Sequence, residues 1–475
     1  MKYQYGAVAS GHKTVTEVGL EILRAGGNAF DAIIACGFAS SVCEPMLSSL
    51  GGGGFLLTHQ QNKTQLFDFF TNHSGLHFPG SINPKFLSVA VNFPGSTQHF
   101  ESGAASIATP GCLHGYFYAH KKLGRLPIRD VIQPTIELAK NGVSVTEFQY
   151  YVHQLLTHII FSDKNSRKIF TQNDQLIPVG EKITNPALAD FLDAIAIEGP
   201  DLFYRGEVAQ TLVNDVQNQG GFLTTQDLEN YQTIIRKPTT HSFEDWTIFT
   251  NPPPASGGQL IAKLLSEIEK KPPSGDTDKD SQNCWLSHFK STEAWRKSIE
   301  KQRLFSRGTT HVSVIDRLGN CASMTTSNGE GAGYTIADAG IMLNNMMGED
   351  DLHPHGYYAE PAGSRISSMM SPTLAFHQDG RRFALGSGGS KRIRDVMTQI
   401  LWQLMKEKQP LHAIINQPRL HFDGERLQCE PGFDPVLPDA TYWDTRDMYF
   451  GGVHIVSNTE PPVGDHRRAG FADFQ

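Results

Sequence analysis

The spacing of apolar residues divides the chain into a largely helical first part and a strand-rich last part. A stripe at helical spacing runs over residues 14–25 and ends at Gly26-Gly27. Asn28 is placed to cap a second helix over 29–42, because its side chain can accept N–H groups of the first turn. This second stretch is rich in Ala, Gly and Ser, so we expect it to pack closely against its neighbours.

Period-two alternation follows the second helix. Residues 55–59 and 65–70 flank a polar turn at 61–63 and predict a β-hairpin. Beyond residue 107, helical spacing returns between Pro and Gly. Four more helices are predicted there, at 128–140, 186–197, 206–219 and 258–268.

Residues 271–280 are polar and helix-breaking, which predicts an exposed loop. The chain then becomes strand-rich. A hairpin is expected from 311–316 and 321–326, and a second one from 372–377 and 383–386. The run Gly386-Ser387-Gly388-Gly389-Ser390 follows directly and opens an amphipathic helix.

Composition is that of an ordinary globular protein, with 475 residues, 39% hydrophobic and 19% charged. The net charge of −8, spread over both signs, argues against a nucleic-acid partner, and no apolar run reaches the length of a membrane span. The first six residues lack the apolar core of a secretory signal. The expected location is the cytoplasm, or the periplasm or exterior if a leader is missing from this sequence. The six scattered cysteines are expected to be buried free thiols.

Thr309 is the candidate nucleophile. It stands between Gly308 and the first strand of the β-rich part. A cut before Thr309 would place a free α-amine beside its hydroxyl, so that one residue supplies both nucleophile and base. Such an amine has a reference pKa of about 7.7–8.0 and can act as a base near neutrality. A Thr-Thr pair at a strand start is, however, also common β-sheet filler.

Gly388 and Gly389 are candidates for the oxyanion hole. They lie between a predicted strand and a predicted helix, where backbone N–H groups can approach a developing negative charge. Residues 51–54 and 386–389 are glycine-rich enough to suggest phosphate binding, but neither run matches GxxxxGK[ST] or GxGxxG. There is no GxSxG motif of a serine hydrolase.

Together these motifs resemble the γ-glutamyltranspeptidase family of N-terminal-nucleophile (Ntn) hydrolases. The resemblance extends nearly end to end, with the family's motifs in order. They lie at 21–32, 51–55, 109–111, 124–127, 252–258, 309–311, 343–347, 367–372 and 386–390.

The resemblance implies an α/β (α+β) fold, a four-layer αββα sandwich with two stacked, mainly antiparallel sheets. It implies cleavage between Gly308 and Thr309 into a large subunit, 1–308, and a small catalytic subunit, 309–475, which remain one intertwined domain. Thr309 would then pass an acyl group from a small amide such as glutathione to water or an amine, with no metal or organic cofactor.

The resemblance also assigns site residues by position. Ser327 falls on the hydroxyl that tunes the nucleophile, and Gly388 and Gly389 fall on the oxyanion pair. The positions that bind the substrate's α-carboxylate and α-amine fall on Ser367, Ser368, Glu349 and Asp350, with Asn328 beside them.

Three positions depart from the family pattern. Phe70 stands where an arginine pairs with the substrate carboxylate, and an aromatic ring cannot replace that bidentate contact. Gly329 replaces an asparagine next to Asn328, and Met346 replaces a glutamine. Residues that would restore the missing cation are Arg365, Lys391 and Arg392.

These departures leave several functions open. The chain is either a γ-glutamyl enzyme or an acylase with the same machinery and a more apolar acyl group, of the cephalosporin-acylase kind. From another class, it is an uncut, inactive relative that serves as a binding protein. A nucleotide-binding enzyme is the remaining alternative.

Overall fold

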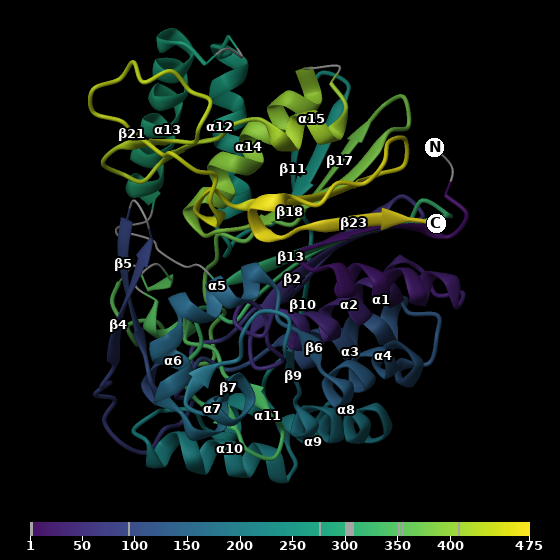
Figure 1. Ribbon diagram of the computed structural model, residues 1–475, viewed down its shortest axis with the longest axis vertical. Coiled ribbons are helices and arrows are strands. Elements are labelled where there is room, and N and C mark those ends of the chain that lie inside the picture. Colours follow the sequence, from purple (N-terminus) through teal and green to yellow (C-terminus); the bar gives the residue numbers. More distant parts are fainter. Residues whose placement is uncertain are drawn as a thin grey trace.

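Two antiparallel sheets lie face to face at the centre of the computed structural model (Figure 1). The structure describes residues 3–93, 96–274, 277–299, 308–349, 352–353, 355–406 and 409–475. The first sheet has the order β10 (Ile234–Arg236), β3 (Lys63–Phe69), β2 (Gly53–Gln60), β14 (Cys321–Ser327), β13 (Thr309–Asp316), β1 (Gly6–Ser10) and β23 (Phe471–Phe474). The second has the order β11 (Thr239–Phe243), β12 (Trp246–Thr250), β17 (Thr373–His377), β18 (Arg382–Gly388) and β22 (Gly452–Ser457).

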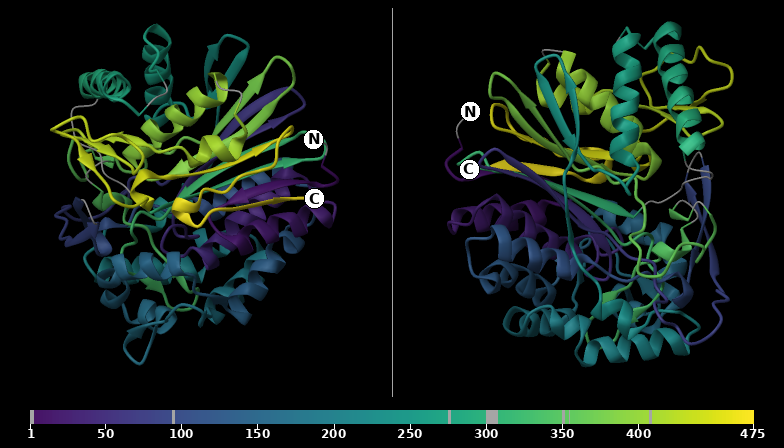
Figure 2. Two further views of the ribbon diagram at one scale, coloured as in Figure 1. Left: turned by 45° about the horizontal axis from the view of Figure 1, so that its top comes forward. Right: turned by 180° about the vertical axis from the view of Figure 1, so that it is seen from behind.

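Helices cover the outer face of each sheet, which confirms the four-layer αββα fold (Figures 1 and 2). On the first sheet lie α1 (Lys13–Arg24) and α2 (Ala29–Cys43), backed by α3 (Cys112–Leu123), α4 (Ile128–Asn141) and α8 (Pro186–Glu198). On the second lie α12 (Gly257–Lys270) and α14 (Lys391–Lys406), with α13 (Lys279–Ile299) and α15 (Leu411–Asn416) outside them.

Smaller elements complete the helical half of the molecule. The helices are α5 (Glu147–Leu155), α6 (Thr157–Ser162), α7 (Lys164–Phe170), α9 (Asp201–Tyr204), α10 (Glu207–Asn218) and α11 (Thr225–Glu229). The strands outside the two main sheets are β4 (Leu87–Phe93), β5 (Ser96–Ser102), β6 (Val143–Ser144), β7 (Thr171–Gln172), β8 (Gln175–Leu176), β9 (Lys182–Ile183), β15 (Thr335–Ile336), β16 (Ile341–Met342), β19 (Leu420–Phe422), β20 (Leu427–Cys429) and β21 (Thr441–Tyr442).

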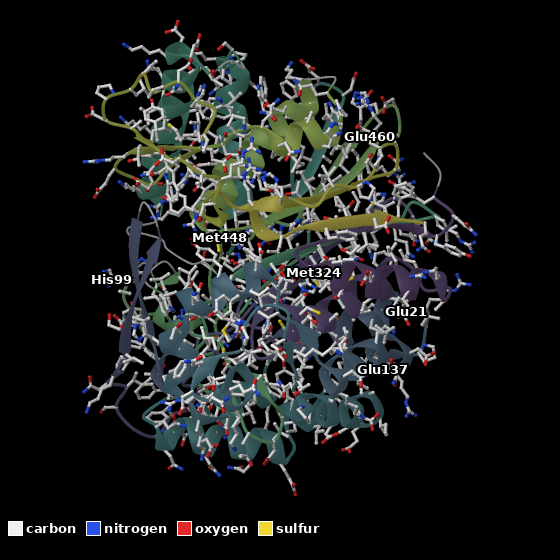
Figure 3. The ribbon with its side chains drawn as sticks, viewed as in Figure 1. Glu21, His99, Glu137, Met324, Met448 and Glu460 are labelled. Atoms are coloured by element: carbon white, nitrogen blue, oxygen red, sulfur yellow. The ribbon has the colours of Figure 1, made fainter. Side chains whose placement is uncertain are left out.

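Helix α2 is the central helix of the core, and every one of its residues is buried. Asn28 caps it as predicted, in a reciprocal box with Asp31. The Asp31 carboxylate also accepts the backbone N–H of Arg125 at 2.9 Å, which joins this helix start to the turn before α4. Gly37 lets the sheet approach the helix, because a Cβ there would lie 2.8 Å from Cε of Met324 on β14. Figure 3 shows Met324 in the interior, whereas Glu21 and Glu137 point outward.

The predicted helices and hairpins are present, with ends that differ by a few residues at most. The prediction of an exposed loop over 271–280 is wrong at its end, because α13 begins at Lys279 and runs for 21 residues. Strands β1, β22 and β23, and strands β10 to β12 of the helical middle, were not predicted. Strand β23 pairs with β1, so the two ends of the chain lie together (Figure 2). All six cysteines are buried and free, as expected.

Replacement of Phe38 by Ala should destabilise the fold by about 3–5 kcal/mol, the usual cost of an unfilled cavity at a fully buried phenylalanine. Its ring lies edge-on to Tyr116, 5.1 Å between centroids, and to Phe117, 6.3 Å between centroids. Urea unfolding followed by circular dichroism measures the change. Glu21→Ala, on the exposed face of α1, is the control, and an equal midpoint for the two variants would contradict the packing described here.

Candidate active site

The pairing of β13 with β14 places the Ser327 hydroxyl beside Thr309 and the bond before it. Thr309 and Ser327 are direct partners in the ladder. The Thr309 hydroxyl donates to Ser327 Oγ at 3.4 Å, and Ser327 Oγ–H donates to the carbonyl of Gly308. The N–H of Gly329 donates to the same Ser327 oxygen at 3.1 Å. A chain of hydrogen bonds therefore runs from the nucleophile through Ser327 to the carbonyl that it would attack.

Two glycines make this close arrangement possible. A Cβ on Gly308 would collide with the carbonyl oxygen of Gly329. Gly329 has φ +63°, and a Cβ there would collide with Asn345 Oδ1 and Glu349 Oε1. An asparagine at this position would therefore require the side chains of Asn345 and Glu349 to shift.

The glycine run before β2 supports the same strand pair from behind. A Cβ on Gly52 would collide with the carbonyl of Ser327, and the Gly52 carbonyl accepts the N–H of Gly111 at 2.8 Å. Close backbone packing explains this run without a phosphate ligand.

Gly388 lies against Thr309, the candidate nucleophile, and Gly389 follows it in the same turn. A Cβ on Gly388 would collide with the carbonyl oxygen of Thr309, so only glycine fits at the end of β18. Gly389 has φ +119°, a conformation that other residues rarely adopt. The chain then enters α14, and the N–H groups of Arg392 and Ile393 donate back to the carbonyls of Gly389 and Ser390.

Arg468 reaches the same place from the far end of the chain. Its Nη1 donates to the Thr309 carbonyl at 2.9 Å and lies 2.7 Å from the Cβ position of Gly388. Arg468 is 3% exposed, and burial lowers the pKa of its guanidinium to about 10. A buried positive charge therefore stands directly beside the nucleophile's backbone.

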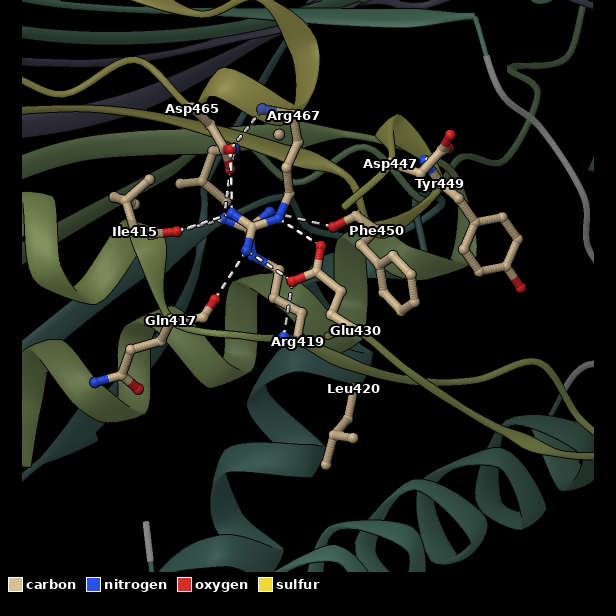
Figure 4. A network of polar contacts seen from close by, with 12 residues as sticks. Ile415, Gln417, Arg419, Leu420, Glu430, Asp447, Tyr449, Phe450, Asp465 and Arg467 are labelled. Atoms are coloured by element: carbon tan, nitrogen blue, oxygen red, sulfur yellow. Dashed lines mark hydrogen bonds and ion pairs between the residues drawn. The ribbon is translucent and has the colours of Figure 1, made fainter. Parts of the chain in front are cut away.

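A buried network of four charges holds the segment that carries Arg468 (Figure 4). Asp465 caps the short 3₁₀ helix His466–Arg468 and pairs with both Arg419 and Arg467. Arg467 also forms a bidentate pair with Glu430, at 2.6 and 2.7 Å. None of these four side chains is more than 1% exposed. The two guanidinium groups hold the pKa of Asp465 below its usual range, although burial alone would raise it.

Glu44 lies on the opposite face of β13. It follows α2, and its Oε1 accepts the hydroxyl of Thr310 at 2.9 Å. Burial raises the pKa of Glu44 to about 7, against the opposing effect of the Thr310 hydrogen bond. The two residues that begin the catalytic strand are thus flanked by a buried carboxyl group on one side and a buried guanidinium on the other.

A small hollow opens at Thr309. Four hydroxyl residues and five apolar ones line it: Thr309, Ser327, Ser368 and Ser390, with Phe70, Leu352, Met369, Met370 and Ile393. None of these lining residues carries a charge.

Ser368 and Ser367 lie on a segment that packs against the start of α12. The Ser368 carbonyl accepts the N–H of Ser256 at 2.9 Å, and a Cβ on Gly257 would collide with the next carbonyl, that of Met369. Ser368 Oγ accepts the N–H of Met370 at 3.1 Å, so its own proton can be given to a bound carboxylate. Ser367 instead donates to the Pro254 carbonyl at 2.9 Å and does not line the hollow.

Phe70 forms one wall of the hollow, stacked on Phe55 with 5.4 Å between the ring centroids. Arg365, the first of the replacement cations, lies behind this wall. It forms an ion pair with Asp68 at 3.2 Å and donates to the Phe70 carbonyl and to Tyr231. Its guanidinium is therefore engaged by Asp68, which also pairs with Arg236, and it does not line the hollow.

The other two candidate cations begin α14 and do not line the hollow. Arg392 donates to the Tyr449 carbonyl at 2.9 Å and lies over the Tyr449 ring. Lys391 is buried in the same turn of helix.

The remaining predicted residues lie on the loop side of Ser327. The Glu349 carboxylate is fully buried beside Gly329, and Asp350 lies outside the described residues. The Asn328 amide is directed at the Leu343 carbonyl, 3.4 Å away, and is not among the residues that line the hollow. Met346 is buried, and its carbonyl accepts a hydrogen bond from His353.

His311 has a structural role in packing the two sheets. Its ring lies between the sheets with both nitrogens engaged, by Thr325 at 2.8 Å and by Ser313 at 2.9 Å. Burial holds the pKa of His311 well below the usual value.

Sequence reasoning did not find Glu44 or Arg468. Each is a charged residue beside a stretch that the sequence predicts as a turn, and no neighbouring residue links it to Thr309. The position of a charged residue between two buried segments is the one feature of the sequence that could have drawn attention to either.

Comparison with known proteins agrees with this geometry. The family model described as gamma-glutamyltranspeptidase matches residues 15–284 and 276–470. The chain belongs to the gamma-glutamyltranspeptidase family. It is therefore an enzyme of the Ntn-hydrolase type. The glutathione hydrolase proenzyme of Escherichia coli K12 is 29% identical, over 92% of this chain and 84% of that protein.

Acylases are also among the relatives of the chain. The acylase ACY 1 proenzyme of Pseudomonas sp. strain SE83 is 28% identical, over 92% of this chain and 86% of that protein. The crystal structure of cephalosporin acylase from Bacillus halodurans superposes with a TM-score of 0.81 at 21% identity, over 100% of this chain and 96% of that one. This last likeness establishes the shared fold.

Two further observations concern membranes and metals. The helices that the structure describes are too short or too polar to cross a bilayer. Within the described ranges, no three His, Cys, Asp or Glu side chains converge as a metal site would require.

Ser327→Ala should slow cleavage at Gly308 by roughly 10²–10³-fold, the usual effect of losing one donor to a developing oxyanion. Ser327→Thr keeps the hydroxyl and should remain within about tenfold of the natural chain. Denaturing electrophoresis of freshly synthesised protein measures the rates. Equal rates for the two variants would show that the Gly308 carbonyl does not depend on this hydroxyl.

Proposed function

We propose that this chain cuts itself between Gly308 and Thr309 and then transfers acyl groups from small amides to water or an amine through an acyl-Thr309 ester. One observation carries the proposal: the Ser327 hydroxyl bridges the nucleophile Oγ1 and the carbonyl before it. The relatives described as proenzymes support it.

The first reaction follows from the hydrogen bonds. Thr309 Oγ1 attacks the Gly308 carbonyl carbon, and its proton moves to Ser327 while Ser327 passes its own proton to the carbonyl oxygen. On collapse of this intermediate the carbonyl re-forms, its proton moves to the Thr309 nitrogen, and the Gly308–Thr309 amide breaks, which leaves an ester on the Thr309 oxygen and a free α-amine. Water then hydrolyses the ester and yields the two subunits, 1–308 and 309–475.

Turnover reuses the same atoms. The α-amine takes the Thr309 hydroxyl proton as Oγ1 attacks the substrate carbonyl, and then gives that proton to the leaving amine. Backbone N–H groups at Gly388 and Gly389 supply the donors for the oxyanion. Because the free amine exists only after cleavage, the uncut chain should be inactive.

The acyl donor that we propose first is a γ-glutamyl amide such as glutathione. In this pose Ser368 donates to its α-carboxylate, and the buried carboxylate of Glu349 receives its α-amine. The kinship with glutathione hydrolases supports this choice.

A more apolar acyl group is the second candidate, and the hollow itself favours it. Phe70, Met369 and Met370 line the hollow, and the Arg365 guanidinium behind it is occupied by Asp68. The acylase relatives are consistent with this alternative.

Thr309→Ala should abolish both cleavage and turnover, because it removes the nucleophile of both reactions. Thr309→Ser keeps a hydroxyl and an amine and should still be cut. Electrophoresis and mass spectrometry of the new N-terminus report cleavage, and circular dichroism confirms that each variant folds. Two fragments from Thr309→Ala, or full turnover by an uncut chain, would refute the proposed function.

Phe70→Arg should raise kcat/KM for γ-glutamyl-p-nitroanilide relative to phenylacetyl-p-nitroanilide by roughly tenfold, since a charged arginine–carboxylate contact stabilises by about 1.5–3 kcal/mol. Phe70→Leu keeps an apolar wall and should leave the ratio unchanged. An unchanged ratio of the two kcat/KM values in Phe70→Arg would show that residue 70 does not contact the acyl group.

A further inference from the structure

Arg468 places a buried positive charge beside the nucleophile. Its guanidinium donates to the Thr309 carbonyl at 2.9 Å and lies directly under the Gly388–Gly389 turn. The side-chain stem packs against Gly452, where a Cβ would lie 2.8 Å from three of its carbons. The Asp465 network fixes the helix turn that presents it. Arg468 therefore has a single well-defined position next to Thr309.

The charge on Arg468 is only partly balanced. Its Nε has no hydrogen-bond partner among the described residues. Asp465 lies on the same helix turn as Arg468. The other ionisable groups around the guanidinium are Glu44 after α2, Arg392 on α14, Asp447 before Met448 and His454 on β22. Arg392 repels the guanidinium, and the three carboxyl groups attract it.

Cleavage before Thr309 creates a second basic group within the field of this arginine. The α-nitrogen of a residue is three covalent bonds from its own carbonyl oxygen, or roughly 3 Å away. A new ammonium group at Thr309 would therefore stand close to the guanidinium that binds this oxygen. Like charges at this range disfavour the protonated form of the weaker base.

We propose that Arg468 is a positioning residue that holds the Thr309 carbonyl and keeps the mature α-amine in its neutral, basic form. This inference rests on the proposed function. An ordinary α-amine has a pKa of about 7.7–8.0, so only the minor, neutral fraction can accept the hydroxyl proton at pH 7. The nearby guanidinium increases that fraction without touching substrate. The inference gives a function to a residue far from the catalytic strand in sequence.

Glu44 should act in the opposite direction. Its carboxyl group binds Thr310 on the other face of β13, and it lies near enough to Arg468 for each to affect the pKa of the other. When ionised, Glu44 stabilises a nearby ammonium. Arg468 and Glu44 therefore have opposite effects on the same amine, and the sign of each can be tested separately.

The test is the pH dependence of kcat/KM in matured enzyme, with Arg468→Gln, Arg468→Lys and Glu44→Gln. Arg468→Gln should move the acid limb up by about one pH unit, so that the rate falls roughly fivefold to tenfold at pH 7 and recovers near pH 9. Arg468→Lys keeps the charge and should keep the wild-type limb. Glu44→Gln should move the limb downward. Arg382→Gln, at the far end of β18 where Arg382 binds the Gly319 carbonyl, is the matched charge control and should not move it.

A second measurement needs no substrate. Competitive acetylation of the Thr309 α-amine with acetic anhydride, read by mass spectrometry from pH 5 to 10, reports the protonation of the amine directly. It should give the same order of variants as the kinetic profiles.

The outcomes separate this inference from the proposed function. A wild-type chain that is never cut overturns both. A wild-type chain that is cut, with Arg468→Gln slowed equally at every pH, overturns the inference alone, because a structural role lowers rates without moving the limb. If Arg468→Gln is never cut, the pH profiles of Glu44→Gln and Arg468→Lys decide whether the inference holds. An unmoved or raised limb in Glu44→Gln, or a raised limb in Arg468→Lys, refutes the inference.

Discussion

The antiparallel register between β13 and β14 is the constraint on which the site depends. It pairs Thr309 with Ser327, so that one hydroxyl meets both the nucleophile and the Gly308 carbonyl. A slip of one residue would turn both side chains to the opposite faces of the sheet. The two flanking strands, β2 and β1, and the buried helix α2 prevent this slip, because the whole apolar pattern of the core would move with it.

Buried charge is concentrated around this strand pair. Four ionised side chains with almost no exposure hold the segment before β23, and from it Arg468 reaches the Thr309 carbonyl. Such charges are costly to bury unless each is paired, and removal of one partner leaves the other uncompensated. Their presence next to the nucleophile is therefore better explained by the positions that they impose than by the stability that they add.

Much of the fold was predictable because its signals are local. Alternation gave the hairpins of β2 with β3 and of β13 with β14, and Asn28 with Asp31 gave the start of α2. Helix α13 was missed because its buried stripe includes polar side chains such as Gln282, Thr292 and Arg296, which mask the apolar period. Strands β1 and β23 are short, and each becomes a strand through its partner rather than through its own pattern.

The order of motifs in the sequence determined the family, the αββα class and the choice of Thr309, Ser327, Gly388 and Gly389 as the residues to examine. The tertiary structure alone decided which charges reach them. Arg365, one of the cations that could have replaced the arginine missing at Phe70, forms an ion pair with Asp68 instead. Glu44 and Arg468 come from opposite ends of the chain and flank the start of β13. The reason is physical: a hydroxyl or a glycine turn is specified by its immediate neighbours, but the effect of a charge depends on distances that exist only after the sheets have packed.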